Sequence, residues 1–241
     1  MDGVLIPIVL LLAGAAFVQS FSGFGMALVA IAALPMLMDV REAIALITVF
    51  NLLVTITTLV MNWRGFRFRG AGGVIVGFVV GIPLGYYFLQ GLDERVVIRV
   101  LGAALVGLAV FEIAMLRRGH LALPKWMGGA CGLTGGVLGG AFNTGGPPIV
   151  AYVYSQDWSK AQIVATLQVA FLCGGLFRTS LMAVEGEHSV RIWTIVAWAA
   201  LPTLFSVWMG YRMLGRVSLR WLRYGVFVFL LAMGLKYLMF P

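Results

Sequence analysis

The sequence predicts an all-α polytopic membrane protein made of two inverted repeats, each a broken-helix hairpin followed by three transmembrane helices. Three observations predict this fold. The 241 residues are 61% hydrophobic and only 11% charged, whereas a soluble domain carries about 25% charged residues. Six segments have the length of a simple membrane span. Two longer apolar segments, one in each half, are interrupted by glycine-rich breaks.

The first overlong segment covers residues 4–38 and contains the break Ser22-Gly23-Phe24-Gly25. The second covers residues 126–154 and contains Asn143-Thr144-Gly145-Gly146-Pro147-Pro148. Both are longer than the ~20 residues that cross a bilayer. The simple spans are predicted at residues 42–62, 71–90, 96–116, 160–182, 192–211 and 221–240.

The distribution of charge favours hairpins that enter and leave the membrane on one side. The four loops at 63–70, 117–125, 155–159 and 212–220 then share one face. That face and its helix ends carry Arg64, Arg67, Arg69, Arg117, Arg118, Lys125, Lys160, Arg212, Arg216, Arg220 and Arg223, against one acid, Asp157. The opposite face carries Asp2, Asp39, Glu42, Asp93, Glu94, Glu185 and Glu187, with fewer basic residues. The positive-inside rule makes the basic face cytoplasmic and places both termini outside the cell membrane. Because the basic residues follow this rule, the net charge of +8 does not indicate a nucleic-acid partner.

A hairpin plus three spans makes an odd number of crossings, so the second half is inverted relative to the first. The repeats are predicted at residues 1–118 and 119–241. Asp39-Val40-Arg41-Glu42-Ala43 after the first hairpin matches Asp157-Trp158-Ser159-Lys160-Ala161 after the second. Inverted repeats with broken helices at their junction are typical of secondary transporters.

The breaks are the predicted substrate site, because broken backbone at mid-membrane depth is tolerated only in a protein interior or a wet cavity. A helix that begins there presents free N–H groups and the positive end of its dipole to an anion. Ser22 and Thr144 are the expected N-caps, and Gln19, Ser20 and Asn143 add neutral polar groups. Gly23, Gly25, Gly145 and Gly146 allow close approach to the backbone; alternatively, these glycines only allow tight helix crossing. On the site hypothesis, a bulky residue at Gly145 abolishes transport without unfolding.

Further polar residues occur within the simple spans. Asn51 and Gln168, with Thr48 and Thr166 nearby, either complete the pocket, bind a coupling ion, or form interhelical hydrogen bonds. Arg178 is a candidate anion ligand, although its place near the outer end of a span favours a side chain that extends to the surface. Glu112 lies near Arg117 and Arg118, which favours an interfacial ion pair over a proton carrier.

Two other residue patterns indicate packing. Gly73, Gly77, Gly81 and Gly85 recur on one helix face, which predicts a close-packing stripe. Cys131 and Cys173 lie in apolar helices and are expected to be free packing residues.

His120 and His188 have no metal-ligand spacing, and no nucleotide-binding, zinc or nucleophile motif occurs. We therefore expect neither an enzyme nor a cofactor.

The motif Asn143-Thr144-Gly145-Gly146-Pro147-Pro148-Ile149-Val150, preceded by Gly135-Gly136-Val137-Leu138-Gly139-Gly140, resembles the second repeat of the TauE/SafE family of sulfite exporters, also called the toluene-sulfonate uptake permease group. The first break resembles the family's first glycine motif, but it has only Gly23 and Gly25 where the family often has a run of glycines. The resemblance implies transport of sulfite or organosulfonates, whereas the residues alone indicate a small anion.

The predicted function is alternating-access transport of a small anion bound between the two hairpin tips. A membrane potential expels a monovalent anion with about 2.3 kcal/mol per 100 mV, and no well-buried acid or histidine is expected in the core, so export is favoured. An anion channel and an uptake permease coupled to protons or sodium remain alternatives. Exposed small-residue faces leave a homodimer open.

Overall fold

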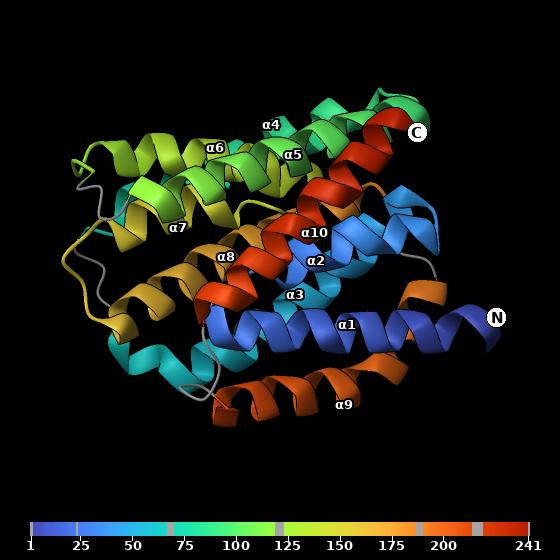
Figure 1. Ribbon diagram of the computed structural model, residues 1–241, viewed down its shortest axis with the longest axis horizontal. Helices are drawn as coiled ribbons and strands as arrows, with labels where there is room; N and C mark the ends of the chain where they lie inside the picture. The colour runs from blue at the N-terminus through green and yellow to red at the C-terminus, as the bar shows by residue number, and fades with distance from the viewer. Residues whose placement is uncertain are drawn as a thin grey trace.

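The structure is a computed structural model of residues 1–241. It describes residues 2–22, 24–66, 70–118, 123–186, 190–213 and 219–240. Every regular element within these ranges is helical (Figure 1). The first half contains α1 (Asp2–Ser22), α2 (Met26–Ala33), α3 (Val40–Asn62), α4 (Gly72–Gln90) and α5 (Glu94–Arg118). The second contains α6 (Met127–Phe142), α7 (Gly146–Tyr154), α8 (Lys160–Val184), α9 (Val190–Met213) and α10 (Leu219–Met239). Short 3-10 turns follow α2 at Leu34–Met36 and α3 at Trp63–Gly65.

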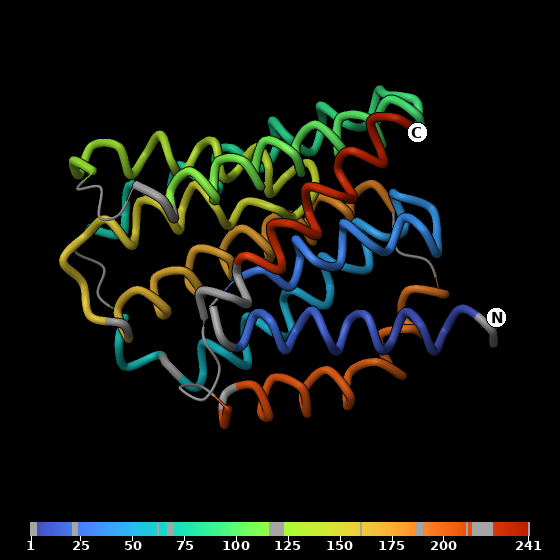
Figure 2. The backbone as a smooth tube through the Cα atoms, in the orientation of Figure 1, coloured from blue at the N-terminus to red at the C-terminus, as the bar shows by residue number. Residues whose placement is uncertain are grey.

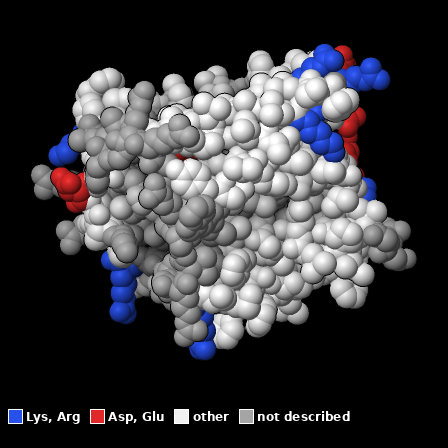
Figure 3. All heavy atoms as spheres, viewed as in Figure 1, with Lys and Arg blue, Asp and Glu red and all other residues white. Residues whose placement is uncertain are grey.

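Five helices are long and apolar enough to cross a membrane, and they agree with five of the six predicted simple spans. They are Val40–Met61, Gly72–Gln90, Glu94–Met115, Ala161–Val184 and Val190–Gly210. The sixth predicted span, 221–240, corresponds to α10, whose described apolar stretch Tyr224–Met239 is shorter. Large apolar side chains such as Leu201, 77% exposed, cover the outside of the bundle. Charged side chains gather toward its two ends (Figure 3). An apolar band between charged ends is the surface of a multi-pass membrane protein.

Both overlong segments are divided into two helices. The chain leaves α1 at Ser22, and Gly25 then precedes α2 with φ 115°, a left-handed conformation that glycine adopts without a steric penalty. The chain leaves α6 at Asn143, whose φ of 61° is also left-handed; asparagine tolerates this region better than other residues with a side chain. Gly23 lies outside the described residues.

Close helix packing holds the bundle together. The main helix pairs are α4 with α6, α1 with α9, α5 with α10 and α3 with α8. Figures 1 and 2 show α1 and α9 side by side along one edge. The α4–α6 pair packs backbone against backbone. A methyl group would meet backbone atoms of the opposite helix at each of six glycines: Gly77, Gly81, Gly85, Gly132, Gly136 and Gly140. The predicted stripe is confirmed at Gly77, Gly81 and Gly85, while a methyl group on Gly73 would make only an ordinary contact.

The two ends of the chain lie at the same end of the bundle (Figure 1). The helices that follow the divided segments, α3 and α8, have polar N-caps, one at this end of the bundle and one at the other. Asp39 accepts hydrogen bonds from the N–H groups of Arg41 and Glu42, and Ser159 forms a capping box with Gln162 at the opposite end, before α8. Several residues on which the sidedness argument rests, Arg67, Arg69, Arg216 and Glu187, lie outside the described residues. So do His120 and His188.

Candidate functional site

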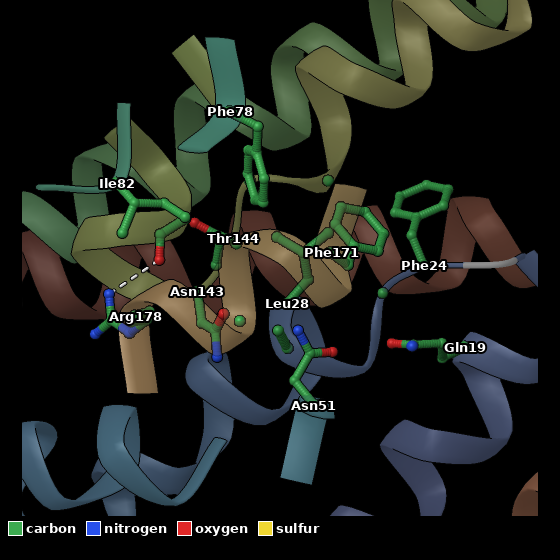
Figure 4. A pocket seen from close by; sticks show the side chains of 17 residues that line it. Gln19, Phe24, Leu28, Asn51, Phe78, Ile82, Asn143, Thr144, Phe171 and Arg178 are labelled. Atoms are coloured by element: carbon green, nitrogen blue, oxygen red, sulfur yellow. Dashed lines mark hydrogen bonds between the residues drawn. The ribbon is translucent and has the colours of Figure 1, made fainter. Parts of the chain in front are cut away.

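A pocket lies where the two helix breaks meet the middle of α3, α4 and α8 (Figure 4). Its volume is about 30 Å³, and a water molecule needs about 10–15 Å³ on this scale. The pocket therefore holds about two or three water molecules, or one anion of similar size. Its wall consists of Gln19, Phe24, Gly25, Ala27, Leu28, Asn51, Phe78, Ile82, Gly139, Asn143, Thr144, Gly145, Gly146, Phe171, Gly174, Gly175 and Arg178.

Gln19, near the end of α1, contributes a buried amide donor to which the described part of the chain offers no acceptor. The side chain is 2% exposed, and its amide end points toward the pocket (Figure 4). Oε1 accepts the N–H of Met26, the first residue of α2, at 3.2 Å. Because this N–H needs an acceptor, the orientation of the amide is fixed, and Nε2 has no hydrogen-bond partner among the described residues. An unsatisfied buried amide donor costs about 1–3 kcal/mol, so the site is better suited to holding an acceptor than to remaining dry.

Arg178 on α8 brings a positive charge to the opposite wall. Its side chain is only 3% exposed and does not extend to the surface, contrary to the snorkelling interpretation. Nε donates to Thr48 Oγ1 at 3.0 Å, and Nη1 donates to the Gly139 carbonyl at 3.0 Å. The guanidinium also lies 5.6 Å from the centre of the Tyr86 ring. These contacts hold the charge at a fixed place between α3, α4 and α6.

Thr48 of α3 links the second break to α8 in one hydrogen-bonded network. Besides accepting from Arg178, its Oγ1 accepts from Asn143 Nδ2 at 3.3 Å and donates to the Ile44 carbonyl at 2.8 Å. Asn143 therefore ends α6 with its backbone and ties the second break to α3 with its side chain. For the polar residues of α3, one of the predicted alternatives was an interhelical hydrogen bond. Thr48 forms such bonds with Arg178 and Asn143.

The N-caps of the two short helices differ from the prediction. They are Gly25 and Gly145, and neither α2 nor α7 has a side-chain cap hydrogen bond. Thr144 instead donates to the Leu138 carbonyl at 3.4 Å, and the side chain of Ser22 lies outside the described set. The reason is that the short helices begin later than a Ser or Thr cap would require, three residues later at the first break and one residue later at the second. Since Pro147 and Pro148 have no N–H, the first turn of α7 offers only the N–H groups around Gly145 and Gly146.

Gly145 also has a packing role, which changes the expected effect of replacing it. An added methyl group would meet the Gly135 carbonyl and, at 2.5 Å, the Phe78 ring. A bulky residue would therefore separate α6 from α7 and disturb folding. The expectation that such a variant loses transport without unfolding is wrong, because the same glycine holds the helix crossing together.

The pocket contains eight of the residues predicted for the site: Gln19, Gly25, Asn51, Asn143, Thr144, Gly145, Gly146 and Arg178. Ser20 is directed elsewhere: its hydroxyl donates to the Phe17 carbonyl at 2.6 Å, and it packs against Gly210 of α9. Gln168 is fully buried in α8 but is not part of the pocket wall. Gly23 and the Ser22 side chain fall outside the described residues.

Sequence reasoning missed the aromatic and glycine part of the wall. Phe78 and Phe171 lie edge to face with ring centres 6.0 Å apart. A methyl group on Gly174 would meet Phe78 and Ile82, and one on Gly175 would meet Leu52, so this glycine pair leaves room beside α8 for Phe78 and Leu52. The sequence did contain a signal for this part of the wall. Gly174 and Gly175 lie in the middle of a span, at about the depth of the two breaks, where paired glycines indicate close packing or a cavity.

Two expectations about ionisable groups can be compared with the structure. Glu112 of α5 is 6% exposed, so the expectation that the core has no well-buried acid is wrong. The side chains of Arg117 and Arg118, its expected partners, are not described. Cys131 and Cys173 are free, as expected. Within the described residues no group of three or more His, Cys, Asp or Glu side chains could hold a metal ion.

Comparison with known proteins supplies the family. The family model "Sulfite exporter TauE/SafE" matches residues 8–237. The "Probable inner membrane transporter protein TsaS" of Comamonas testosteroni is 27% identical over 181 residues, 73% of this chain and 74% of the relative. The "Probable sulfite/organosulfonate exporter TauE" of Cupriavidus necator is 25% identical over 213 residues, 84% of this chain and 81% of the relative. No solved structure is a significant match. The family model covers nearly all of the chain, which therefore belongs to the TauE/SafE family of sulfite exporters.

Proposed function

We propose that this protein is a secondary transporter that exports sulfite, or an organosulfonate of similar size, across the inner membrane by alternating access. The observation that carries the proposal is the pocket between the helix breaks. On one side lies the unpartnered Nε2 of Gln19, and on the other lies the guanidinium of Arg178. Donors on two sides and a positive charge on one are the chemistry that binds a small oxyanion.

The size of the pocket favours the smaller substrates. Sulfite has four heavy atoms, which suits a volume of about 30 Å³, whereas an aromatic sulfonate needs several times that space. The anion's oxygens would accept from Gln19 Nε2, from the N–H groups around Gly145 and Gly146, and from Arg178 after a shift of its guanidinium. Phe78 and Phe171 would exclude water from the remaining wall.

Two features of the helix arrangement support the proposal of inverted repeats, and with it alternating access. The first helix of each half packs on the fourth helix of the other half, α1 on α9 and α6 on α4. Equivalent N-caps of the two halves are separated by the same number of residues. Gly25 and Gly145, the N-caps beside the breaks, are as far apart in sequence as Asp39 and Ser159, the N-caps of the next helices. Such correspondence is expected of two repeats, at residues 1–118 and 119–241, that rock about a shared site. With an odd number of crossings in each repeat, both termini would lie outside the cytoplasm.

The test is flux in proteoliposomes under a clamped potential, comparing sulfite with short-chain and aromatic sulfonates, with and without sodium and pH gradients. We expect saturable sulfite flux that follows the potential, needs no ion gradient and shows counterflow. No flux above that of empty liposomes would refute the proposal. Flux that does not saturate and shows no counterflow would indicate a channel.

A proton-coupled uptake permease is the second candidate, and the burial of Glu112 favours it. A carboxyl group inside a membrane protein is often part of a proton relay. Glu112 does not belong to the pocket wall, however, so coupling would have to act through α5. Flux of an organosulfonate that requires a pH gradient and is lost in Glu112→Gln would establish this candidate in place of export.

A further inference from the structure

A second pocket of about 30 Å³ lies beyond Arg178, and Arg178 belongs to the walls of both pockets. The second pocket is lined by Arg41, Ile44, Tyr86, Leu89, Gln90, Val97, Gly140, Ala141 and Arg178. We propose that it is an outer binding subsite for the same small oxyanion, occupied on the way between the central pocket and the end of the bundle that carries Asp39. This inference rests on the proposed function and names a further site on its pathway.

The two pockets follow each other along the same helices. On α3 the central pocket has Asn51 and the outer pocket has Ile44, with Thr48 one turn from each. On α4 the corresponding residues are Ile82 and Tyr86, again one turn apart. The walls therefore follow each other along α3 and α4, and Arg178, which lines both pockets, lies between the two spaces.

Arg178 is held there by hydrogen bonds to Thr48 and Gly139. Arg178 Nε and Nη1 bind the Thr48 hydroxyl and the Gly139 carbonyl, each at 3.0 Å, and Figure 4 shows the guanidinium at the edge of the central pocket. A rotation of this one side chain would open the way between the two spaces. An anion on either side attracts the guanidinium, so the same charge can serve both sites in turn.

The outer pocket contains a second cation, Arg41, which is exposed and held in place. Its Nη2 donates to the Leu89 carbonyl at 3.4 Å and to the Leu92 carbonyl at 2.7 Å, at the end of α4. The Gln90 side chain adds an amide to the same wall. Two guanidinium groups and an amide around a small space are a suitable surface for an oxyanion.

The experiment measures sulfite flux from each side separately, in right-side-out and inside-out membrane vesicles, at low and moderate salt. Arg41→Gln is expected to raise KM about threefold or more on the side that carries Asp39, to flatten the salt dependence there, and to leave the opposite side unchanged. Arg41→Lys, which keeps the charge, is expected to stay within about twofold of the parent. The matched control is Arg191→Gln, which removes one exposed charge at the same end of the bundle, where Arg191 pairs with Glu42 at 2.8 Å, but does not line either pocket.

Gln90→Glu is the second variant, for the case that Arg41→Gln does not fold. It adds a negative charge to the outer pocket without removing the hydrogen bonds of Arg41, and is expected to raise KM on the same side only. An unchanged KM in both variants, or an equal change from both sides or in Arg191→Gln, would overturn the outer subsite. Absence of sulfite flux in the parent protein would refute the proposed function instead, so the two failures are distinguishable.

Discussion

Gln19 provides the sharpest test of the central pocket, through the replacement Gln19→Met. Methionine has similar length and flexibility but offers no N–H donor. A hydrogen bond to a charged partner is worth about 1.5–3 kcal/mol, and each 1.4 kcal/mol is a factor of ten. If Nε2 binds the anion, the apparent affinity should fall roughly 10- to 100-fold.

The stability of this variant should change much less than its affinity. The Met26 N–H loses its acceptor, which costs about 1–3 kcal/mol, but the unpartnered Nε2 is removed as well, which recovers a similar amount. Gln19→Glu keeps an acceptor for Met26 and places a negative charge in the pocket, so it should fold and lose transport. The assays are KM for sulfite flux in proteoliposomes and thermal unfolding of the detergent-purified protein.

Gln168→Met is the comparison variant, because Gln168 is as deeply buried but does not line the pocket. We expect it to reduce thermal stability and to leave KM unchanged. Equal KM values for Gln19→Met and the parent protein would refute the role of Nε2. A raised KM in Gln168→Met would show that the sequence-based site, which included this residue, was the better description.

Three further variants test the packing and the polar network. Gly81→Leu would force the backbones of α4 and α6 apart, so size-exclusion chromatography should show little folded protein. Thr48→Val removes the hydroxyl that accepts hydrogen bonds from Arg178 and Asn143. It should lower the free energy of unfolding by about 1–3 kcal/mol and reduce sulfite flux. Unchanged flux would show that transport does not depend on this network. Glu42→Gln breaks the exposed ion pair with Arg191 and should change the free energy of unfolding by less than about 1 kcal/mol, as measured by chemical denaturation.

The helices could be predicted because their signals are local. Length and hydropathy mark α3, α4, α5, α8 and α9 as candidate spans. Glycine and proline mark the points where the two overlong segments are divided. The every-fourth-residue glycines of α4 likewise predict a packing face from one helix alone, and the structure supplies α6 as the partner.

The pocket was predictable only where it coincides with a break. Gln19, Gly25 and Asn143 are adjacent to the breaks in sequence, and the structure brings them together. The direction of the Arg178 side chain depends instead on Thr48 and Gly139, which come from two other helices. Position along a span cannot distinguish an arginine that reaches the surface from one that turns inward, because the decisive partners are distant in sequence.

The way the helices pack indicates which contacts can change during transport. The α4–α6 pair is joined through backbone contacts at six glycines, and separating it would lose the close van der Waals packing that small residues allow between membrane helices. The pair should therefore move as one body. In contrast, α3 and α8 meet at the pocket through side chains, including the single hydrogen bond from Arg178 to Thr48. Because one side-chain hydrogen bond contributes only about 0.5–3 kcal/mol, we expect alternating access to involve a local rearrangement of α3 and α8 around the pocket, with Arg178 releasing Thr48 while α4 and α6 stay in contact.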